Sequence, residues 1–266
     1  MKWPIIMHVN YCEQGQTIPE MCQKAVKWGY DGIEFRGESS DPAMTSEEYI
    51  DTIARAVKSS GLKHVVLGGG GRITSLEESM KFYKLAAKNF KLSVCNIAVG
   101  MIPGGSAVAT KEAWQKGVDH LKMLAKIAQE VGFKFALEIH MGYLHDLPAS
   151  TMRLLEMLDN PAVGANLDFG NIVELQDTLT IEDTVSMLGE NLYYVHLKNS
   201  YKLKDGSRFA TNLADGTINH REYLKVLDKY GYEGFLCIEA PRAGDREWFA
   251  QQDIAYLKTL MDELGL

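Results

Sequence analysis

The sequence is poor in cysteine, has no long apolar run and carries no excess of positive charge. Only four of its 266 residues are cysteine, and no two form a Cys-x-x-Cys pair. This pattern predicts small buried side chains in a reducing compartment. No apolar stretch approaches the roughly 18 residues that span a membrane. The net charge of −7 disfavours a nucleic-acid surface, which needs a basic stripe.

The first residues also lack the long apolar core of a secretory signal peptide. MKWPIIMHVN continues directly into a strand-like pattern. We therefore expect a cytoplasmic protein with no membrane or nucleic-acid partner. Its charge and composition suit an enzyme for a small metabolite.

Short apolar runs alternate with longer segments of helical periodicity along the whole chain. Eight runs are typical of strands: 4–10, 31–37, 63–69, 93–99, 134–140, 163–169, 193–199 and 234–240. Helical segments lie near 18–29, 46–60, 76–91, 111–131, 148–159, 180–189, 219–230 and 246–263. Thr17 with Glu20 and Thr45 with Glu48 fit the capping box, in which the side chain of each residue accepts a hydrogen bond from the backbone amide of the other.

Eight alternating strand and helix units imply a parallel sheet. Several strand candidates are apolar on nearly every residue, as in strands covered on both faces. The first strand is followed by Asn10-Tyr11-Cys12-Glu13-Gln14-Gly15, without the glycine fingerprint expected of an open doubly wound sheet. The sequence therefore predicts an α/β fold, a closed (β/α)₈ TIM barrel, as a single domain over residues 1–266. Long loops are expected at 68–74, 100–110 and 199–218, on the face where such barrels carry their active sites.

Four ionisable residues end four successive predicted strands: Glu138, Asp168, His196 and Glu239. In a barrel, side chains at equivalent positions on adjacent strands converge on one point. Three carboxylates that converge repel one another unless a cation neutralises them. Oxygen and imidazole ligands without a thiolate favour Mn²⁺, and Mg²⁺, Co²⁺ or Zn²⁺ remain possible. The sequence thus predicts one divalent metal ion, which would polarise a substrate carbonyl.

The motifs around these residues, LEIH, LDFGN, VHLKN and IEAP, resemble those of the xylose-isomerase-like TIM-barrel sugar (phosphate) isomerase/epimerase superfamily. The ketose 3-epimerase and hydroxypyruvate isomerase branches are nearest. The resemblance covers essentially the whole chain and implies a metal-dependent isomerase or epimerase for a small sugar or hydroxy-ketone. Glu138 and Glu239 would be both ligands and the acid/base pair, removing and returning a proton next to the carbonyl through an enediolate. The family also suggests dimers or tetramers.

Three further residues are candidate substrate contacts. His140 shares a face with Glu138 because side chains alternate along a strand. Arg208 resembles the family's arginine that holds a substrate oxygen. Asn171 stands where the epimerase branch commonly has histidine; asparagine can hydrogen-bond a sugar hydroxyl but cannot shuttle protons. Lys198 shares a face with His196, and its role as carboxylate partner or substrate contact stays open, as does the direction of Glu34 on the second strand.

Other functions fit the same features less fully. An enediolate can also expel a β-leaving group, so a dehydratase or lyase acting on a keto-inositol or keto-sugar is the alternative. A non-catalytic sugar-binding barrel should have lost part of the ligand set. A metal-dependent endonuclease needs more histidines than the seven in this chain and a basic surface.

Overall fold

The strands of this protein form a closed barrel. The computed structural model describes residues 1–12, 15–68, 75–176, 178–239 and 244–266. Among these residues, eight parallel strands pair in the closed order β1-β10-β7-β6-β5-β4-β3-β2. Their bounds are β1 (Ile5–His8), β2 (Gly32–Arg36), β3 (His64–Gly68), β4 (Leu92–Ile97), β5 (Lys134–Glu138), β6 (Val163–Asp168), β7 (Leu192–Leu197) and β10 (Phe235–Ile238). The closed barrel confirms the predicted (β/α)₈ fold.

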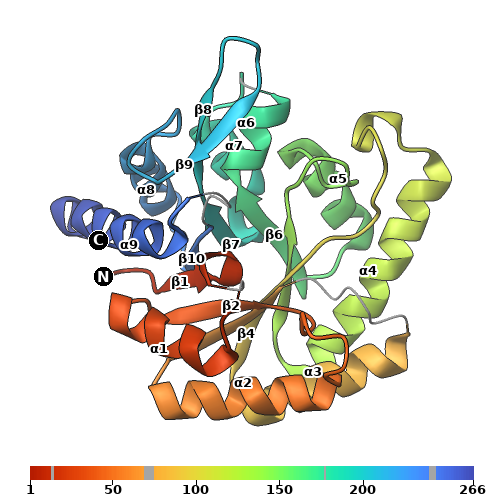
Figure 1. The fold of residues 1–266 in the computed structure, drawn as a ribbon. Helices are drawn as coiled ribbons and strands as arrows, with labels where there is room; N and C mark the ends of the chain where they lie inside the picture. Colours follow the sequence, from red (N-terminus) through yellow and green to blue (C-terminus); the bar gives the residue numbers. More distant parts are fainter. Residues whose placement is uncertain (13–14, 69–74, 177, 240–243) are drawn as a thin grey trace.

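Helices surround the barrel (Figure 1). They are α1 (Ile18–Trp28), α2 (Ser46–Ser60), α3 (Leu76–Asn89), α4 (Lys111–Val131), α5 (Pro148–Leu158), α6 (Phe169–Leu175), α7 (Ile181–Leu188), α8 (His220–Lys229) and α9 (Arg246–Leu264). Short 3₁₀ turns are η1 (Val9–Tyr11), η2 (Ser106–Val108) and η3 (Gly189–Asn191). Thr17 and Thr45 form the predicted capping boxes with Glu20 and Glu48. Within the described residues, no helix has the length and apolarity needed to cross a membrane.

Alternation along the strands divides the barrel interior into an apolar layer and a polar layer. Ile6, Val94, Ala136, Tyr194 and Cys237 belong to a buried cluster separate from the larger core between strands and helices. Two residues further along the same strands, the side chains on the same face are polar. These are His8, Asn96, Glu138, His196 and Glu239. The apolar layer therefore forms the floor beneath a polar layer at the carboxyl ends of the strands.

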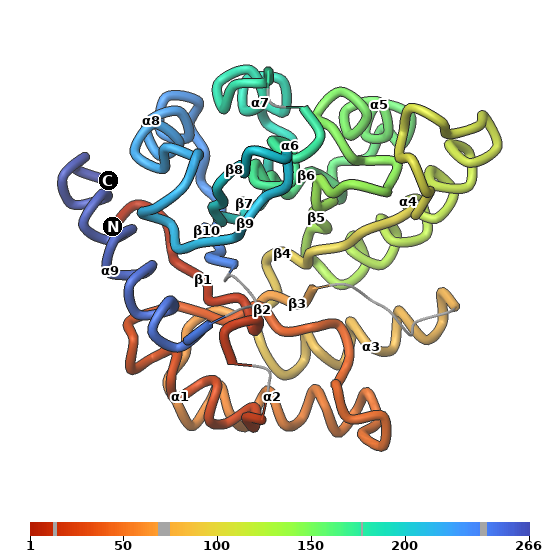
Figure 2. Tube along the Cα trace, turned by 45° about the horizontal axis from the view of Figure 1, so that its top comes forward, coloured from red at the N-terminus to blue at the C-terminus, as the bar shows by residue number. Residues whose placement is uncertain are grey.

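Two elements depart from the predicted pattern. The stretch 199–218, predicted as a long loop, contains an antiparallel hairpin of β8 (Asn199–Lys202) and β9 (Arg208–Thr211). Asp205 and Gly206 turn the chain: Gly206 has φ +87°, and the Asp205 carboxylate accepts from the Ser207 amide at 3.0 Å. An aspartate–glycine pair is a hairpin signal. The hairpin projects past the neighbouring helices in Figure 1 and runs near the end of β7 in Figure 2.

The second departure is α6, which follows β6 directly where no helix was predicted. Asp168 caps it by accepting from the Asn171 amide at 3.2 Å. The predicted loop 68–74 lies outside the described residues from 69 onward. All four cysteines are free and buried, which confirms their prediction as small buried side chains.

Candidate metal centre

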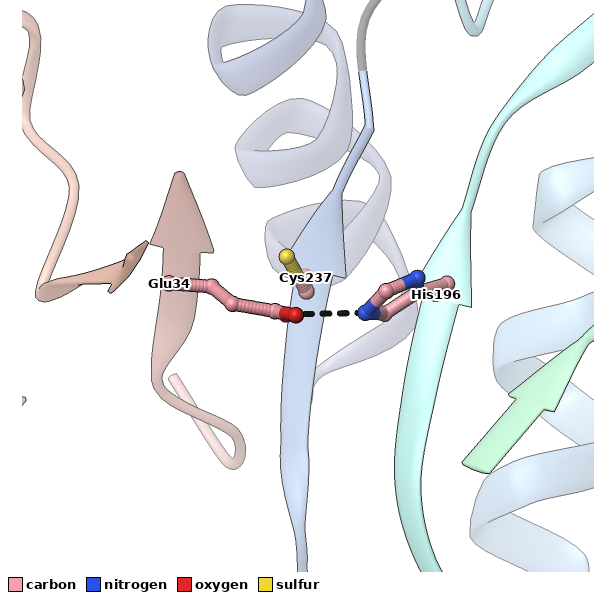
Figure 3. Close-up of side chains that lie close together, drawn as sticks. All are labelled: Glu34, His196 and Cys237. Carbon is pink, nitrogen blue, oxygen red and sulfur yellow. Dashed lines mark hydrogen bonds and ion pairs between the residues drawn. The ribbon is translucent and has the colours of Figure 1, made fainter. Parts of the chain in front are cut away.

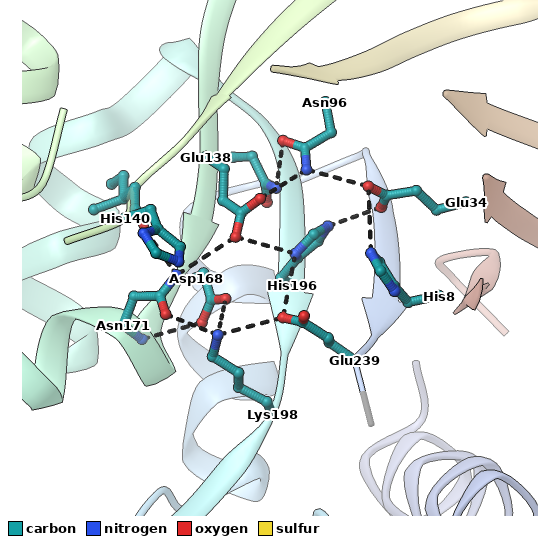
Figure 4. Close-up of polar contacts among 12 residues, drawn as sticks. His8, Glu34, Asn96, Glu138, His140, Asp168, Asn171, His196, Lys198 and Glu239 are labelled. Atoms are coloured by element: carbon teal, nitrogen blue, oxygen red, sulfur yellow. Dashed lines mark hydrogen bonds and ion pairs between the residues drawn. The ribbon is translucent and has the colours of Figure 1, made fainter. Parts of the chain in front are cut away.

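The four predicted ligands lie together at the carboxyl ends of the strands. Glu138 and Asp168 are the last residues of β5 and β6, His196 pairs in register with Asp168, and Glu239 follows β10 directly. One ligand atom from each residue lies within 4.8 Å of every other (Figure 4). Asp168 and His196 are buried, whereas the side chains of Glu138 and Glu239 are 19% and 14% exposed. The cluster is therefore largely buried, and its remaining exposure is at the two glutamates.

Of the two nitrogens of the His196 imidazole, one is hydrogen-bonded and the other has no hydrogen-bond partner among the described residues. Its Nε2 lies 2.8 Å from Glu34 Oε2. Its Nδ1 is buried without a hydrogen-bond partner among the described residues, and lies 3.9 Å from both Glu138 Oε1 and Glu239 Oε2. A buried polar atom without a partner is costly unless a ligand satisfies it. Three carboxylates around this nitrogen fit a divalent cation.

Lys198 supplies the positive charge next to the cluster. Its Nζ lies 2.7 Å from Asp168 Oδ2, 3.3 Å from Glu239 Oε2 and 2.8 Å from Asn171 Oδ1. Burial opposes the charge of the ammonium, yet Asp168, Glu239 and Glu138 together raise the pKa of Lys198 above its ordinary value. Lys198 therefore pairs with carboxylates of the cluster, which is one of the two roles that alternation alone left open.

The same surroundings act differently on the carboxylates. Burial raises the pKa of Asp168 to about 6, against the opposing effect of Lys198. Burial also disfavours the charge of Glu239, but Lys198, His8 and His196 outweigh it and hold the pKa of Glu239 below its ordinary range.

Amide side chains, which the sequence analysis did not single out, orient the two glutamates. Asn96 Nδ2 donates to Glu138 Oε2 at 2.8 Å, and Asn10 Nδ2 donates to Glu239 Oε1 at 2.8 Å. Asn96 could have been noticed as an amide that interrupts the apolar run SVCNIAV, because a buried amide requires partners. Asn10 follows β1 and carries no comparable signal.

The sequence analysis also did not identify His145, whose imidazole contacts the backbone at the end of β5. Its Nδ1 lies 2.6 Å from the Glu138 carbonyl oxygen, and its Nε2 accepts from the Val99 amide at 3.0 Å. The ring is fully buried, and burial lowers the pKa of His145 to about 4. A neutral imidazole with its proton on Nδ1 satisfies both bonds.

The three predicted substrate contacts take different positions. Asn171 lies within the cluster, with Nδ2 3.0 Å from the Ile139 carbonyl oxygen and 3.5 Å from Glu138 Oε1. Figure 4 shows His140 at the edge of the cluster, where its Nδ1 lies 2.8 Å from the Met141 carbonyl oxygen.

Arg208 is placed elsewhere, on β9. Its guanidinium donates to the Val173 carbonyl oxygen of α6 at 2.6 Å and to Thr217 Oγ1 at 3.3 Å. The structure thus brings Asn171 and His140 to the ligands, and brings Arg208 to α6.

Comparison with known proteins fits this geometry. The family model described as xylose isomerase-like TIM barrel matches residues 22–260. An inosose dehydratase of Clostridium perfringens is 28% identical over 153 residues, which are 51% of this chain and 50% of that protein. The chain thus matches about half the length of such curated relatives.

Two solved structures share the fold. The probable 3-DHS dehydratase AsbF of Bacillus anthracis, involved in petrobactin synthesis, is 19% identical with a TM-score of 0.79, covering 96% of this chain and 98% of that one. A D-allulose 3-epimerase of Methylomonas sp. is 17% identical with a TM-score of 0.75, covering 98% and 100%. With the family match spanning most of its length and the barrel closed as expected, the chain belongs to the xylose isomerase-like TIM barrel family.

Proposed function

We propose that this protein is a divalent-metal-dependent dehydratase that acts on a keto-cyclitol or keto-sugar. The observation that carries the proposal is the ammonium of Lys198 beside the ligand cluster, 2.7 Å from Asp168 and 2.8 Å from Asn171. Elimination needs a proton donor for the departing hydroxyl in addition to a base. The dehydratases among the relatives and structural neighbours support the same reaction class.

Glu138, Asp168, His196 and Glu239 would hold the cation. When bound, the ion would stabilise negative charge on the substrate's carbonyl oxygen and so acidify the adjacent C–H bond. The donor set favours Mn²⁺, with Mg²⁺, Co²⁺ or Zn²⁺ as alternatives. Asn171 and His140 would hydrogen-bond substrate hydroxyls. A substrate contact by Arg208 stays a prediction.

The proposed steps balance as a stepwise β-elimination. Glu138 or Glu239 takes the proton from the carbon next to the ketone, and the electron pair of the C–H bond forms the enediolate. The carbonyl then re-forms, a double bond forms between the α and β carbons, and the β C–O bond breaks. Lys198 gives a proton to the departing hydroxide, which leaves as water. Against the effect of burial, the carboxylates raise the pKa of Lys198, and a bound cation that neutralises them would lower this pKa and favour the transfer. Asn96 and Asn10 hold the two glutamates at one oxygen each, which keeps the other oxygens directed at the cluster.

Epimerisation or isomerisation is the second candidate. Glu138 and Glu239 come from β5 and β10, which are separated in the barrel by β6 and β7. Two bases from opposite sides of a cluster suit removal of a proton from one face of a carbon and its return to the other. In that reaction Lys198 would orient the substrate and would donate no proton to a leaving group.

Proton exchange followed by NMR tests both candidates. Metal-loaded protein in D₂O would be incubated with ketoses, inososes and hydroxypyruvate, with Glu138→Gln and Glu239→Gln as controls. We expect deuterium next to a ketone and an unsaturated product. Lys198→Met should keep the exchange and lose the unsaturated product. Exchange with inverted or isomerised product and no unsaturation would favour the second candidate. No exchange across the panel despite bound metal would refute enediolate chemistry on these substrates.

Assembly and location complete the proposal. The family resemblance predicts a homodimer or homotetramer with a small sugar or hydroxy-ketone as its binding partner, and the cysteine and apolar patterns of the sequence predict a cytoplasmic location. Native mass spectrometry of the purified full chain would give the number of subunits.

A further inference from the structure

We propose that Glu34 is a positioning residue for the metal centre, whose carboxylate fixes the His196 imidazole with its proton on Nε2 and its lone pair on Nδ1. This inference rests on the proposed function, because it presupposes that His196 binds the cation. Glu34 contacts no substrate in this scheme and acts through a ligand.

The carboxylate reaches His196 across the interior of the barrel. Glu34 is on β2 and His196 is on β7, and these strands are not neighbours in the barrel order. Figure 3 shows the Glu34 side chain extended toward the imidazole, with Cys237 of β10 between the two strands. The distance from Glu34 Oε2 to His196 Nε2 is 2.8 Å, and both side chains are 1% exposed. The two residues therefore form a bond that water does not reach.

The other contacts of the carboxylate orient it. Tyr194 donates from its hydroxyl to Oε2 at 2.7 Å, and Asn96 donates from Nδ2 to Oε1 at 3.1 Å. A buried carboxylate is costly unless donors surround it. These donors direct Oε2 at the imidazole. A carboxylate that accepts the second N–H of a ligating histidine selects its tautomer and ring orientation.

Asn96 extends the effect to a second ligand. Its Nδ2 donates to Glu34 and also to Glu138 Oε2 at 2.8 Å, while its Oδ1 accepts from Asn166 Nδ2 at 3.0 Å. The Asn166 contact leaves the amide only one orientation, with its NH₂ group toward both carboxylates. Glu34 and Asn96 therefore hold His196 and Glu138 in one connected arrangement.

Gly68 on β3 leaves the space that the carboxylate occupies. A Cβ atom at this position would lie 2.6 Å from Glu34 Oε1, closer than such contacts allow. Gly68→Ala therefore pushes on the carboxylate without altering any hydrogen-bonding group, and provides a perturbation independent of the charge.

Glu34→Gln is the main test because it keeps the shape of the side chain and replaces one hydrogen-bond acceptor by a donor. One oxygen of the carboxylate becomes an NH₂ group, which must face either Asn96 or His196, and both are donors there. If it faces His196, the imidazole has to move its proton to Nδ1, the nitrogen that the cation needs. Calorimetric titration of the metal-free full chain with Mn²⁺ should show an affinity about 10- to 100-fold lower than that of the original protein.

Two further variants accompany Glu34→Gln, one as a second perturbation and one as a control. Gly68→Ala should weaken Mn²⁺ binding in the same direction. Tyr30→Phe is the control, since it removes a buried tyrosine hydroxyl that donates to the Ala250 carbonyl oxygen at 2.8 Å rather than to Glu34, and should retain an affinity close to the original. The ¹⁵N NMR spectrum of Zn²⁺-loaded, ¹⁵N-histidine-labelled protein gives a second readout. His196 should show a protonated Nε2 in the original chain and a changed pattern in Glu34→Gln.

The possible outcomes distinguish the role of Glu34 from the proposed function. Unchanged Mn²⁺ affinity and an unchanged His196 spectrum in both Glu34→Gln and Gly68→Ala would overturn the role of Glu34 and leave the proposed function intact. Failure of the original chain to bind any of Mn²⁺, Mg²⁺, Co²⁺ or Zn²⁺ would overturn the proposed function as well. If Glu34→Gln does not fold, Gly68→Ala with unchanged affinity and spectrum refutes the inference.

Discussion

Replacing Lys198 by methionine should destabilise the metal-free protein far more than the metal-loaded protein. The ammonium lies 2.7 Å from the fully buried Asp168 and 3.3 Å from Glu239, and the lysine side chain is 25% exposed. Removing one partner of a buried ion pair costs about 3–5 kcal/mol. Partial exposure and the raised pKa of Asp168 place the expected loss at about 3 kcal/mol.

A bound divalent cation changes this result because it neutralises the same carboxylates. With Mn²⁺ present, the cost of removing Lys198 should fall to about 1 kcal/mol, the scale of a screened pair. The difference of about 2 kcal/mol corresponds to roughly 4–8 °C in melting temperature for a chain of this size. Saturating Mn²⁺ should therefore raise the melting temperature of Lys198→Met more than that of the original protein, by about that amount.

Differential scanning calorimetry of both proteins, with EDTA and with excess Mn²⁺, measures this comparison. Lys122→Met is a suitable control, since Lys122 is 59% exposed and pairs only at 3.8 Å with Asp119. An equal or smaller Mn²⁺ effect in Lys198→Met would show that Lys198 and the cation do not neutralise the same charges, and would refute the reasoning.

Three further predictions concern other parts of the barrel. Burial lowers the pKa of His220 to about 4, so the native state excludes a proton that the unfolded chain binds below about pH 6.5. The stability that the neutral His220 contributes is present above that pH, and the free energy of unfolding should fall by about 2 kcal/mol between pH 8 and pH 5. In His220→Gln, the free energy of unfolding measured in urea should depend less on pH. Tyr11→Phe removes the 2.6 Å bond to the buried Asp253 and should lower the free energy of unfolding in urea by about 1–3 kcal/mol; no measurable loss would contradict it. Gly164→Ala would place a Cβ 2.5 Å from the Asn191 carbonyl oxygen. This overpacking should lower the free energy of unfolding in urea by about 1–3 kcal/mol. Gly132→Ala is the comparison, because its Cβ would meet no neighbouring atom while φ is +89°, so its loss reports backbone strain alone.

The parts of the fold that could be predicted are those set by local patterns. The strands could be predicted because they are short apolar runs, and the four predicted ligands could be brought together because each ends such a run at an equivalent place. The hairpin of β8 and β9 is also a local feature, because the Asp205–Gly206 pair is a turn signal between two short strands.

The supporting contacts could not be predicted, for a different reason. Glu34 and His196 are 162 residues apart in sequence, and their contact depends on the register of the whole barrel. A shift of one residue in either strand would turn the side chain to the opposite face. Asn10 and Asn96 likewise depend on which carboxylates stand across from them. Sequence patterns indicate that a polar residue is buried, but only the closed barrel determines its partner.

The first and last strands of the barrel are hydrogen-bonded neighbours, since β1 pairs with β10, and this has a consequence for biosynthesis. Glu239 follows β10, and its carboxylate is held by Asn10, 229 residues earlier in the chain. A ribosome must therefore synthesise the chain from Asn10 through Glu239 before the fourth predicted ligand can join the other three. A nascent chain halted before Glu239 would expose three of the predicted ligands without the group that completes the set.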